Sequence, residues 1–207
     1  MALHQFEAHA LEIAPTLLGA VLGVESEDGT VLLRITEVEA YHGIGTPGPH
    51  DESSHASRRK TLRNASMFGP PGHAYVYFTY GMHHALNVVC SPAGTPSAVL
   101  LRSAEVIDGD EIVRIRRQAK RRGTRPILDS QLASGPGNLA TALALSRNEH
   151  DGRDLAASPF SLVLSERQAV FERGPRVGVV GSPDLPWRFW TPGPSVSTFR
   201  PGRGLSQ

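Results

Sequence analysis

Cysteine and long apolar runs are both scarce in this chain of 207 residues. Cys90 is the only cysteine, so no disulfide can form within the chain and no cysteine-rich metal site can be built. No stretch approaches the roughly 20 consecutive apolar residues that a membrane-spanning helix requires. These scarcities exclude a disulfide-stapled scaffold, and we expect no membrane partner.

The first part of the chain is also poor in positive charge, because no lysine or arginine precedes Arg34. Without an early basic residue or a long apolar run, neither a secretory signal peptide nor an arginine-rich transit peptide is expected. A single cysteine suits a reducing compartment. We therefore expect the protein to act in the cytoplasm.

Composition is otherwise ordinary, with 40% apolar and 20% charged residues, which is typical of a globular protein. The length suits one domain, and neither a repeat nor a linker interrupts the chain. We expect a single domain over residues 1–207, with an irregular tail from about residue 183. The tail is rich in proline and carries Trp187, Phe189 and Trp190, which we expect to pack back onto the body.

Hydrophobic spacing predicts helices and strands without a repeating strand-helix-strand rhythm. The expected helices cover 7–18, a basic segment 111–122, and 139–145 with a start near 134; the expected strands cover 21–24, 31–40, 74–80, 82–90, 99–104 and 176–180. An Asp28-Gly29 turn would join the first two strands, and 42–73 would form a long surface loop. The fold class is α+β, with a curved, mainly antiparallel sheet, flanking helices and a protruding hairpin.

Alternation along the second strand predicts which of its side chains share a side. One side would carry Ile35, Glu37, Glu39 and Tyr41, and the other Thr36, Val38 and Ala40. Glu39 and Tyr41 are therefore expected to point the same way.

Charge is distributed unevenly along the chain. Residues 1–57 hold nine acidic residues against Arg34 alone, whereas 58–125 hold twelve basic residues against four acidic ones. A local basic face suits a polyanionic partner. A solvated helix face explains such a charge run equally well, so both interpretations stay open.

Several segments together resemble the 3-methyladenine (alkyladenine, methylpurine) DNA glycosylase family. They are Thr36-Glu37-Val38-Glu39-Ala40-Tyr41, Asp51-Glu52-Ser53-Ser54-His55, Arg63-Asn64, Tyr75-Val76-Tyr77-Phe78-Thr79-Tyr80-Gly81-Met82, Asn87-Val88, Leu100-Leu101-Arg102 and Ser134-Gly135-Pro136. Their order and approximate spacing match too, and the resemblance runs from about Leu17 to about Gly181. The combination is much more specific than any one motif.

The resemblance implies a monofunctional DNA glycosylase of base excision repair. Such an enzyme flips an alkylated purine out of double-stranded DNA and hydrolyses its N-glycosidic bond, leaving an abasic site, without a cofactor. It implies 3-methyladenine as substrate, with 7-methylguanine, hypoxanthine and ethenoadenine as further candidates, and we expect a monomer. Strand nicking usually needs an amine nucleophile; the only lysines, Lys60 and Lys120, match no site position of the family.

Glu39 is the candidate general base. Glycosidic cleavage passes through a cationic, oxocarbenium-like state, so a carboxylate must activate water and offset the charge on the sugar. Glu37 fits an exposed strand glutamate better. The resemblance implies that Arg102 holds the water or the sugar-phosphate, and that the backbone near Val179 completes the water site. Arg102 could equally be a structural ion-pair partner.

Flat side chains are needed to replace the stacking that a flipped base loses. The resemblance assigns this role to Tyr41, His55 and Tyr77, and it places Asn87 against the exocyclic amine of normal guanine. Tyr80 at the hairpin tip would fill the gap in the duplex. A tyrosine folded over the sheet is the alternative for Tyr80.

Phosphate contacts without sequence readout are expected from basic side chains. The candidates are Arg58, Arg59, Lys60, Arg63, Arg114, Arg117 and Arg121. No metal site is expected, because the histidines between His42 and His84 fit no recognised ligand spacing. Two other classes remain open: a non-catalytic module that binds damaged DNA, and a small-molecule nucleoside hydrolase, which would need neither the basic segment nor the wedge.

Overall fold

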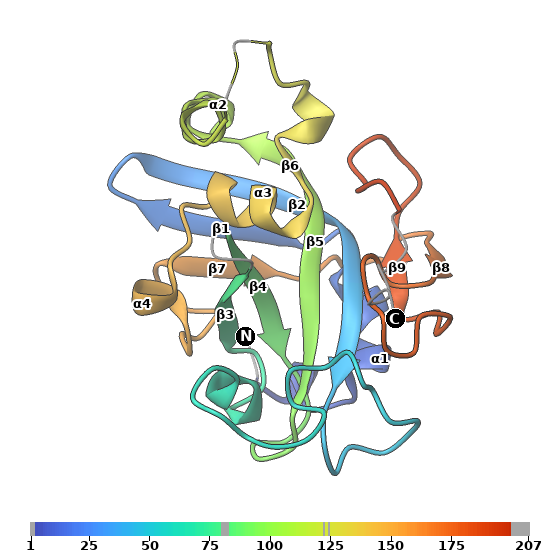
Figure 1. The fold of residues 1–207 in the computed structure, drawn as a ribbon. Helices are drawn as coiled ribbons and strands as arrows, with labels where there is room; N and C mark the ends of the chain where they lie inside the picture. Colours follow the sequence, from blue (N-terminus) through green and yellow to red (C-terminus); the bar gives the residue numbers. More distant parts are fainter. Residues whose placement is uncertain (1–2, 80–82, 122, 124, 200–207) are drawn as a thin grey trace.

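The computed structural model describes residues 3–79, 83–121, 123 and 125–199. Its described strands form one curled antiparallel sheet in the order β3-β4-β5-β2-β1-β7 (Figure 1). Their bounds are β1 Val21–Ser26, β2 Gly29–His42, β3 Ala74–Thr79, β4 His83–Val89, β5 Ser97–Asp108 and β7 Phe160–Val163. Three short strands complete it: β6 Ala133–Ser134 pairs with β5, and β8 Glu172–Gly174 pairs with β9 Arg188–Trp190, which pairs with β2. The α+β class is confirmed.

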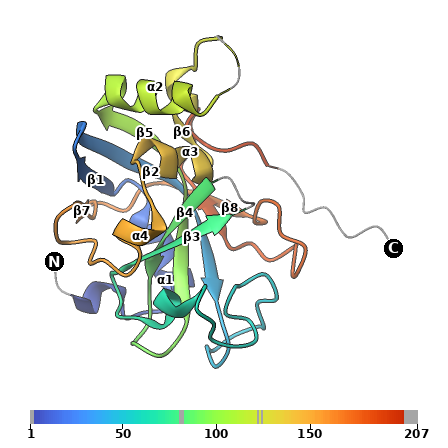
Figure 2. The same ribbon diagram turned by 60° about the vertical axis from the view of Figure 1, so that its left-hand side comes forward.

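The helices are short and lie around this sheet (Figure 2). They are η1 Leu3–Phe6, α1 Ala10–Ile13, η2 Ala14–Leu17, η3 Ala65–Phe68, α2 Asp110–Ala119, η4 Asp129–Gln131, α3 Pro136–Ala142 and α4 Arg147–His150. The helix α3 packs on β4 and β5, and α2 packs against α3. Within the described part of the chain, no helix is both long and apolar enough to cross a membrane.

Local sequence explains the sharp start of α2. Gly109 precedes the helix at a φ of +80°, and a Cβ there would lie 2.7 Å from the Thr30 carbonyl oxygen. Acidic residues occupy the first turn and basic residues the last, which complements the helix dipole. The helix expected at 7–18 is instead divided into α1 and η2, with Pro15 in the first turn of η2.

One feature of β2 was not expected from alternation. Ile35 pairs with Ala104 and Glu37 with Ser103, so Thr36 is an extra residue on β2. Beyond it the alternation reverses, and Ile35, Val38 and Ala40 all belong to the hydrophobic core. The prediction that Ile35 shares a side with Glu39 is therefore wrong, because a bulge turns the strand over between them.

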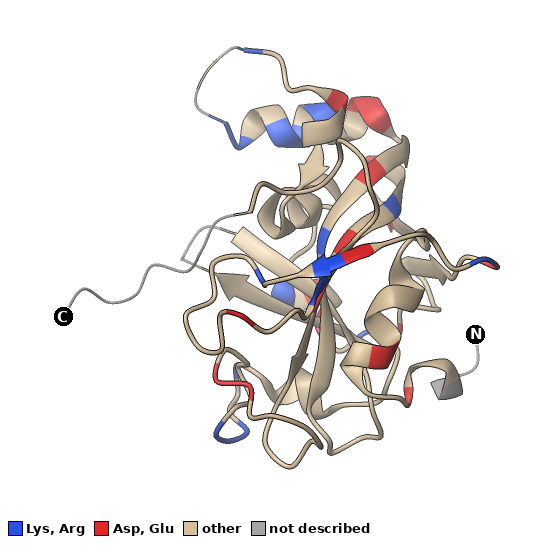
Figure 3. Cartoon of the chain, turned by 90° about the vertical axis from the view of Figure 1, so that its right-hand side faces the viewer, with Lys and Arg blue, Asp and Glu red and all other residues tan. Residues whose placement is uncertain are grey.

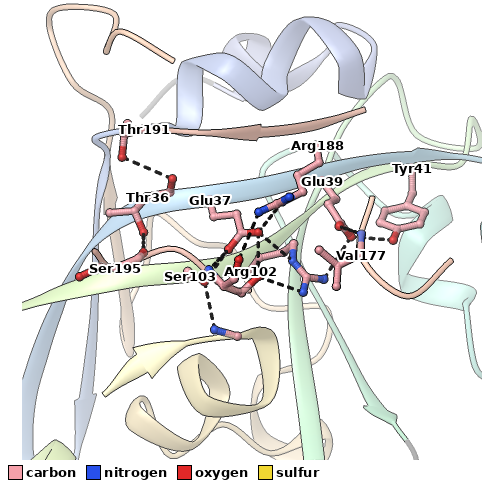
Figure 4. A network of polar contacts seen from close by, with 12 residues as sticks. Thr36, Glu37, Glu39, Tyr41, Arg102, Ser103, Val177, Arg188, Thr191 and Ser195 are labelled. Carbon is pink, nitrogen blue, oxygen red and sulfur yellow. Dashed lines mark hydrogen bonds and ion pairs between the residues drawn. The ribbon is translucent and has the colours of Figure 1, made fainter. Parts of the chain in front are cut away.

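The partner strand β5 carries a matching irregularity. Glu37 pairs with Ser103 and Val38 with Leu101, so Arg102 is the extra residue on that strand. Bulges commonly re-aim side chains beside functional sites. Here two neighbouring bulges bring Glu37, Glu39 and Arg102 together (Figure 4).

The strand expected at 176–180 does not form, and this prediction is wrong. The backbone there makes a turn, and the Val177 amide donates to the Glu39 carboxylate instead of to a neighbouring strand. Residues 188–190 of the tail form β9 instead of irregular chain. Trp187 and Phe189 pack into the core, as expected. The expected hairpin tip at Tyr80-Gly81 lies outside the described residues.

Candidate active site

A cavity of about 760 Å³ opens between β3, β4, β5, the loop after β2 and the turn at 177–181. Alternation explains how the strands line it, since Tyr75 and Tyr77 on β3 face the cavity while Val76 lies in the core. The sequence-predicted residues that line it are Tyr41, His55, Arg63, Tyr77, Asn87, Arg102 and Val179. The fold thus gathers residues that are up to 138 positions apart, from Tyr41 to Val179.

Glu39 is fully buried and lies directly behind the cavity wall. Its Oε1 accepts from the Val177 amide at 2.6 Å, and its Oε2 accepts from the Tyr41 hydroxyl at 2.8 Å and from Arg102 Nη1 at 3.3 Å (Figure 4). All three donor residues line the cavity. An ionised carboxylate offers about four acceptor positions, so these donors leave room for one more.

Tyr41 forms one wall of the cavity and donates to Glu39. Burial and the neighbouring Glu39 carboxylate raise the pKa of Tyr41 well above its ordinary value, so its hydroxyl keeps its proton. Burial works against the charge of Arg102, but Glu39 and Glu37 raise the pKa of this guanidinium. Among its side-chain donors, Glu39 therefore has one neutral donor, Tyr41, and one cationic donor, Arg102.

His55 forms a second wall. Its Nδ1 lies 2.8 Å from the Tyr75 hydroxyl, and its ring meets the Tyr77 ring edge-on at 4.5 Å between centroids. Burial, with a contribution from the Arg63 guanidinium, lowers the pKa of His55 to about 4. The imidazole is consequently neutral near pH 7, and the cavity presents uncharged aromatic surfaces.

Asn87 lies on β4, where it pairs with Tyr75 on one side and Leu100 on the other. Its Nδ2 donates to the Tyr75 carbonyl oxygen at 3.0 Å, and the residue is buried. This bond fixes the direction of the side-chain amide at the cavity. Asn87 is therefore a rigid polar group among the aromatic walls.

Glu37 was expected to be exposed and is instead fully buried. It accepts hydrogen bonds from Arg188 at 2.6 Å, Arg102 at 3.3 Å, the Ser103 hydroxyl at 2.7 Å, and the amide and hydroxyl of Ser197 at 2.7 and 2.8 Å. Burial alone would raise the pKa of Glu37, but Arg102, Ser103, Ser197 and Arg188 outweigh it and hold this pKa below its ordinary value. The exposed interpretation of Glu37 is wrong because the bulge turns it inward together with Glu39.

Sequence reasoning also missed Arg176 and Asp51, which form a buried ion pair beside Tyr41. Asp51 stands in one of the quoted motifs, but no role was assigned to it. Arg176 was assigned to a strand that does not form. Charged residues are rarely fully buried, so a buried arginine or aspartate would point to a special role. The sequence alone does not show which charged residues are buried.

The predicted phosphate-contacting residues separate into two groups. Arg58, Arg59, Lys60 and Arg63 are exposed on the loop after β2, and Arg63 also lines the cavity. On α2, Arg114 pairs with Asp110 and Asp129, and Arg117 Nε donates to the Leu132 carbonyl at 2.8 Å. Just after α2, Arg121 donates to the Arg125 carbonyl at 3.0 Å. The loop and α2 lie toward opposite ends of the molecule (Figure 3).

Two further predictions concern the Tyr80 wedge and the absence of a metal site. Tyr80 lies outside the described residues, so its side chain is not placed. Among the residues that the structure describes, no three His, Cys, Asp or Glu side chains gather in a way that could hold a metal ion.

The arrangement of Glu39, Arg102 and the aromatic walls invites comparison with known proteins. The family model for methylpurine-DNA glycosylase matches residues 4–195 of this chain. The chain belongs to the methylpurine-DNA glycosylase family. The matched range includes every cavity residue discussed above. The protein is therefore a DNA glycosylase of DNA repair, a class that hydrolyses N-glycosyl bonds.

Relatives in this family are similar over nearly their whole length. A protein of Leifsonia xyli subsp. xyli is 52% identical over 199 residues, covering 94% of this chain and 90% of its own. A protein of Streptomyces avermitilis is 48% identical, covering 94% and 89%, and one of Cutibacterium acnes is 43% identical, covering 92% and 95%. All three carry the provisional name of 3-methyladenine DNA glycosylase.

Proposed function

We propose that this methylpurine-DNA glycosylase hydrolyses the N-glycosidic bond of 3-methyladenine in duplex DNA, with Glu39 as general base. The observation that carries the proposal is the buried Glu39 carboxylate, whose three donors all line an aromatic cavity. A carboxylate in this place can activate a water and offset the positive charge that develops on the sugar.

The water would take the remaining acceptor position of Glu39 on the cavity side. Arg102 and Val179 both line the cavity, so Arg102 and the backbone near Val179 are the groups we assign to holding the water. The Arg102 guanidinium also faces the cavity as a cation, which suits the sugar-phosphate of the flipped nucleotide. The base would leave and an abasic site would remain.

The flipped purine would stack between Tyr41, His55 and Tyr77, with Asn87 against its edge. These three aromatic walls are uncharged near pH 7 because His55 is neutral there. Cationic bases such as 3-methyladenine and 7-methylguanine leave as neutral molecules and need no acid from the protein. Hypoxanthine and ethenoadenine must gain a proton first, so we propose that they are cleaved more slowly.

The duplex would approach the exposed cations of the loop after β2, beside the cavity mouth where Arg63 lies. Tyr80 remains our proposed wedge at the hairpin tip. We propose that the enzyme acts as a monomer, releases the base without nicking the strand, and does so because neither Lys60 nor Lys120 lines the cavity.

The deciding experiment is single-turnover release of 3-methyladenine from methylated duplex DNA. We expect wild type to release the base, and Glu39→Gln to bind the same DNA while its rate constant falls by about 10²–10⁴-fold, the range for loss of a general base. Glu105→Gln, which changes an exposed glutamate on β5, is the matched control and should retain the rate.

Two results would contradict parts of the proposal. If wild type and Glu39→Gln both bind damaged DNA and neither releases base, the protein is a non-catalytic damage-binding module. If borohydride traps a covalent adduct between the protein and DNA, an amine nucleophile acts and the enzyme also nicks the strand.

A further inference from the structure

Arg176 is the largest fully buried side chain of the described chain, and the mechanism above gives it no role. Its Nη1 and Nη2 bind Asp51 in a bidentate pair at 2.8 and 2.7 Å, and Nη1 also donates to the Ala40 carbonyl at 3.0 Å. Burial works against its charge, but Asp51 and Tyr41 raise the pKa of Arg176, so it is a cation. Burying a cation costs free energy through desolvation, which its ion pair and hydrogen bonds must offset.

Two aromatic rings flank this guanidinium. Its Cζ lies 4.3 Å from the centroid of the Tyr41 ring and 5.0 Å from that of Trp187. Because Arg176 is fully buried while Tyr41 lines the cavity, the guanidinium supports Tyr41 from the side away from solvent. A planar guanidinium can stack on a ring and bind a carboxylate in two places at once, which an ammonium cannot do.

The same residue connects three separate parts of the site. Its carbonyl partner Ala40 and its stacking partner Tyr41 lie on β2, and Asp51 lies four residues before His55 in the loop. The next residue along the chain, Val177, donates its amide to Glu39 at 2.6 Å. Asp51 in turn accepts from the amides of His42 and Ser53 at 3.3 and 3.1 Å.

We propose that Arg176 and Asp51 form a positioning pair that fixes the Tyr41 ring and the Val177 amide against Glu39. This inference rests on the proposed function, since the positioned groups are the base-stacking wall and the general base. A displacement of about 1 Å at a reacting centre can cost on the order of 10²-fold in rate. Loss of the pair should therefore lower the rate of base release more than it lowers DNA binding.

The chain offers a matched control in Arg188. Arg188 is also buried, pairs with a buried carboxylate, Glu37, at 2.6 Å, and stacks at 4.4 Å on the Trp190 ring. Within the described part of the chain, its side chain donates to Glu37 and to the Ser197 carbonyl and lies over the Trp190 and Phe199 rings, and not against Tyr41 or Asp51. A general effect of disturbing a buried arginine should appear equally in both variants.

The experiment compares Arg176→Lys and Asp51→Asn with Arg188→Lys. For each folded variant, three quantities are measured: the single-turnover rate constant at saturating enzyme, the Kd for duplex DNA carrying an abasic site, and the NMR resonances of ¹³C-labelled tyrosine rings. We expect Arg176→Lys and Asp51→Asn to lose between about 10-fold and 10²-fold in rate constant, the cost of a displacement near 1 Å, with little change in Kd. Both should shift the Tyr41 resonances, and Arg188→Lys should do neither.

The result that overturns the inference is a Tyr41 resonance that stays in place in Arg176→Lys and Asp51→Asn. Equal losses of rate in Arg176→Lys and Arg188→Lys would also overturn it, because both would then reflect general destabilisation. Asp51→Asn keeps the shape of the carboxylate and serves if Arg176→Lys does not fold. If wild type releases no base while the Tyr41 shift appears, the proposed function fails and the positioning pair stands.

Discussion

Glu37 and Glu39 stand two residues apart on β2, both are fully buried, and both accept from Arg102, yet their surroundings differ in kind (Figure 4). The donors of Glu39 line the cavity, so its carboxylate lies one side chain away from solvent. Glu37 is enclosed by Ser103, by Arg188 of β9 and by Ser197 of the tail. Burial of an acid therefore does not by itself indicate catalysis, and the position of its donors is the more informative property.

The difference also assigns separate tasks to the two ends of the network. The Glu37 end binds the C-terminal tail to the sheet through Arg188 and Ser197. The Glu39 end lies behind the cavity wall, and its three donors line the cavity. Arg102 joins them, because its Nε donates to Glu37 and its Nη1 to Glu39. Both interpretations of Arg102, site residue and structural ion-pair partner, thus fit different atoms of one guanidinium.

Among variants that test the contrast between Glu37 and Glu39, we expect Glu37→Gln to cause the largest loss of stability. Removing one charge from a buried ion pair costs about 3–5 kcal/mol of unfolding free energy, because the remaining charge stays buried without a partner. Urea unfolding followed by tryptophan fluorescence measures this loss. The rate constant of the fraction that remains folded should stay close to that of wild type; a selective loss of rate would instead place Glu37 in the chemistry.

The lowered pKa of Glu37 also determines how its contribution to the free energy of unfolding changes with pH. The pKa of Glu37 is lowered in the folded protein from an ordinary value near 4.5, so its contribution to stability is complete above that value. The contribution is lost as pH falls through the folded pKa, when the carboxyl must take up a proton. Unfolding free energies of wild type and Glu37→Gln should therefore converge below pH 4.5, and parallel curves would contradict this assignment.

Smaller losses are expected from removing one hydroxyl that donates to Glu37 or one that donates to Glu39. Ser197→Ala deletes a bond to Glu37 and should cost about 1.5–3 kcal/mol of stability, the range for hydrogen bonds to charged groups, with the rate unchanged. Tyr41→Phe deletes the hydroxyl that donates to Glu39 and should lower the single-turnover rate about tenfold, equivalent to roughly 1.4 kcal/mol. If both variants lose rate equally, the two ends are not separate.

On the cavity side, His55 should stay neutral far below its ordinary pKa. Burial and Arg63 lower the pKa of His55 to about 4 from an ordinary value of 6.5, so NMR titration should detect no protonation of its ring until near pH 4. Since the folded pKa is the lower one, stability from this group is full above pH 6.5 and declines as pH falls from there toward 4. Arg63→Gln should raise the pKa of His55; an unchanged titration would mean that burial acts alone.

The smallest effect that we expect is on DNA binding, where an exposed arginine can be compared with one held by ion pairs. Arg59 is exposed on the loop, whereas Arg114 is held by Asp110, Asp129 and the Ile127 carbonyl. Arg59→Ala should weaken binding to undamaged duplex and reduce the slope of log K against log salt by about 1, the share of one phosphate contact. Arg114→Ala should leave the slope unchanged. A reduced slope for Arg114→Ala would show that DNA reaches α2 as well.

Much of the fold could be predicted from sequence because it depends on local patterns. The hairpins β1–β2 and β3–β4, the strand β5 and the helices α2 and α3 all lie where alternation, turn residues and helical spacing indicate them. The base-stacking candidates Tyr41, His55 and Tyr77 do line one cavity. Alternation is unbroken along β3, so the prediction there needed no knowledge of a partner strand.

The remainder depends on contacts between distant segments. The bulges at Thr36 and Arg102 are properties of the β2–β5 pair, and neither strand shows them alone. Arg176 and Asp51 are 125 residues apart, so their pairing follows from the closed fold and not from any local pattern. The interpretation of Glu37 failed for the same reason, because its five hydrogen bonds come from β5, β9 and the tail.

The extra residue at Thr36 means that the side chains of β2 facing the core change from odd-numbered to even-numbered positions. Before it, odd-numbered side chains such as Leu33 and Ile35 enter hydrocarbon; after it, even-numbered ones such as Val38 and Ala40 do. Removing that single residue would exchange the two sets, so that both carboxylates would point into the core and Val38 and Ala40 would take their places in the polar network. The register of β2, as much as residue identity, therefore decides that Glu39 lies beside the cavity-lining donors and not in the core.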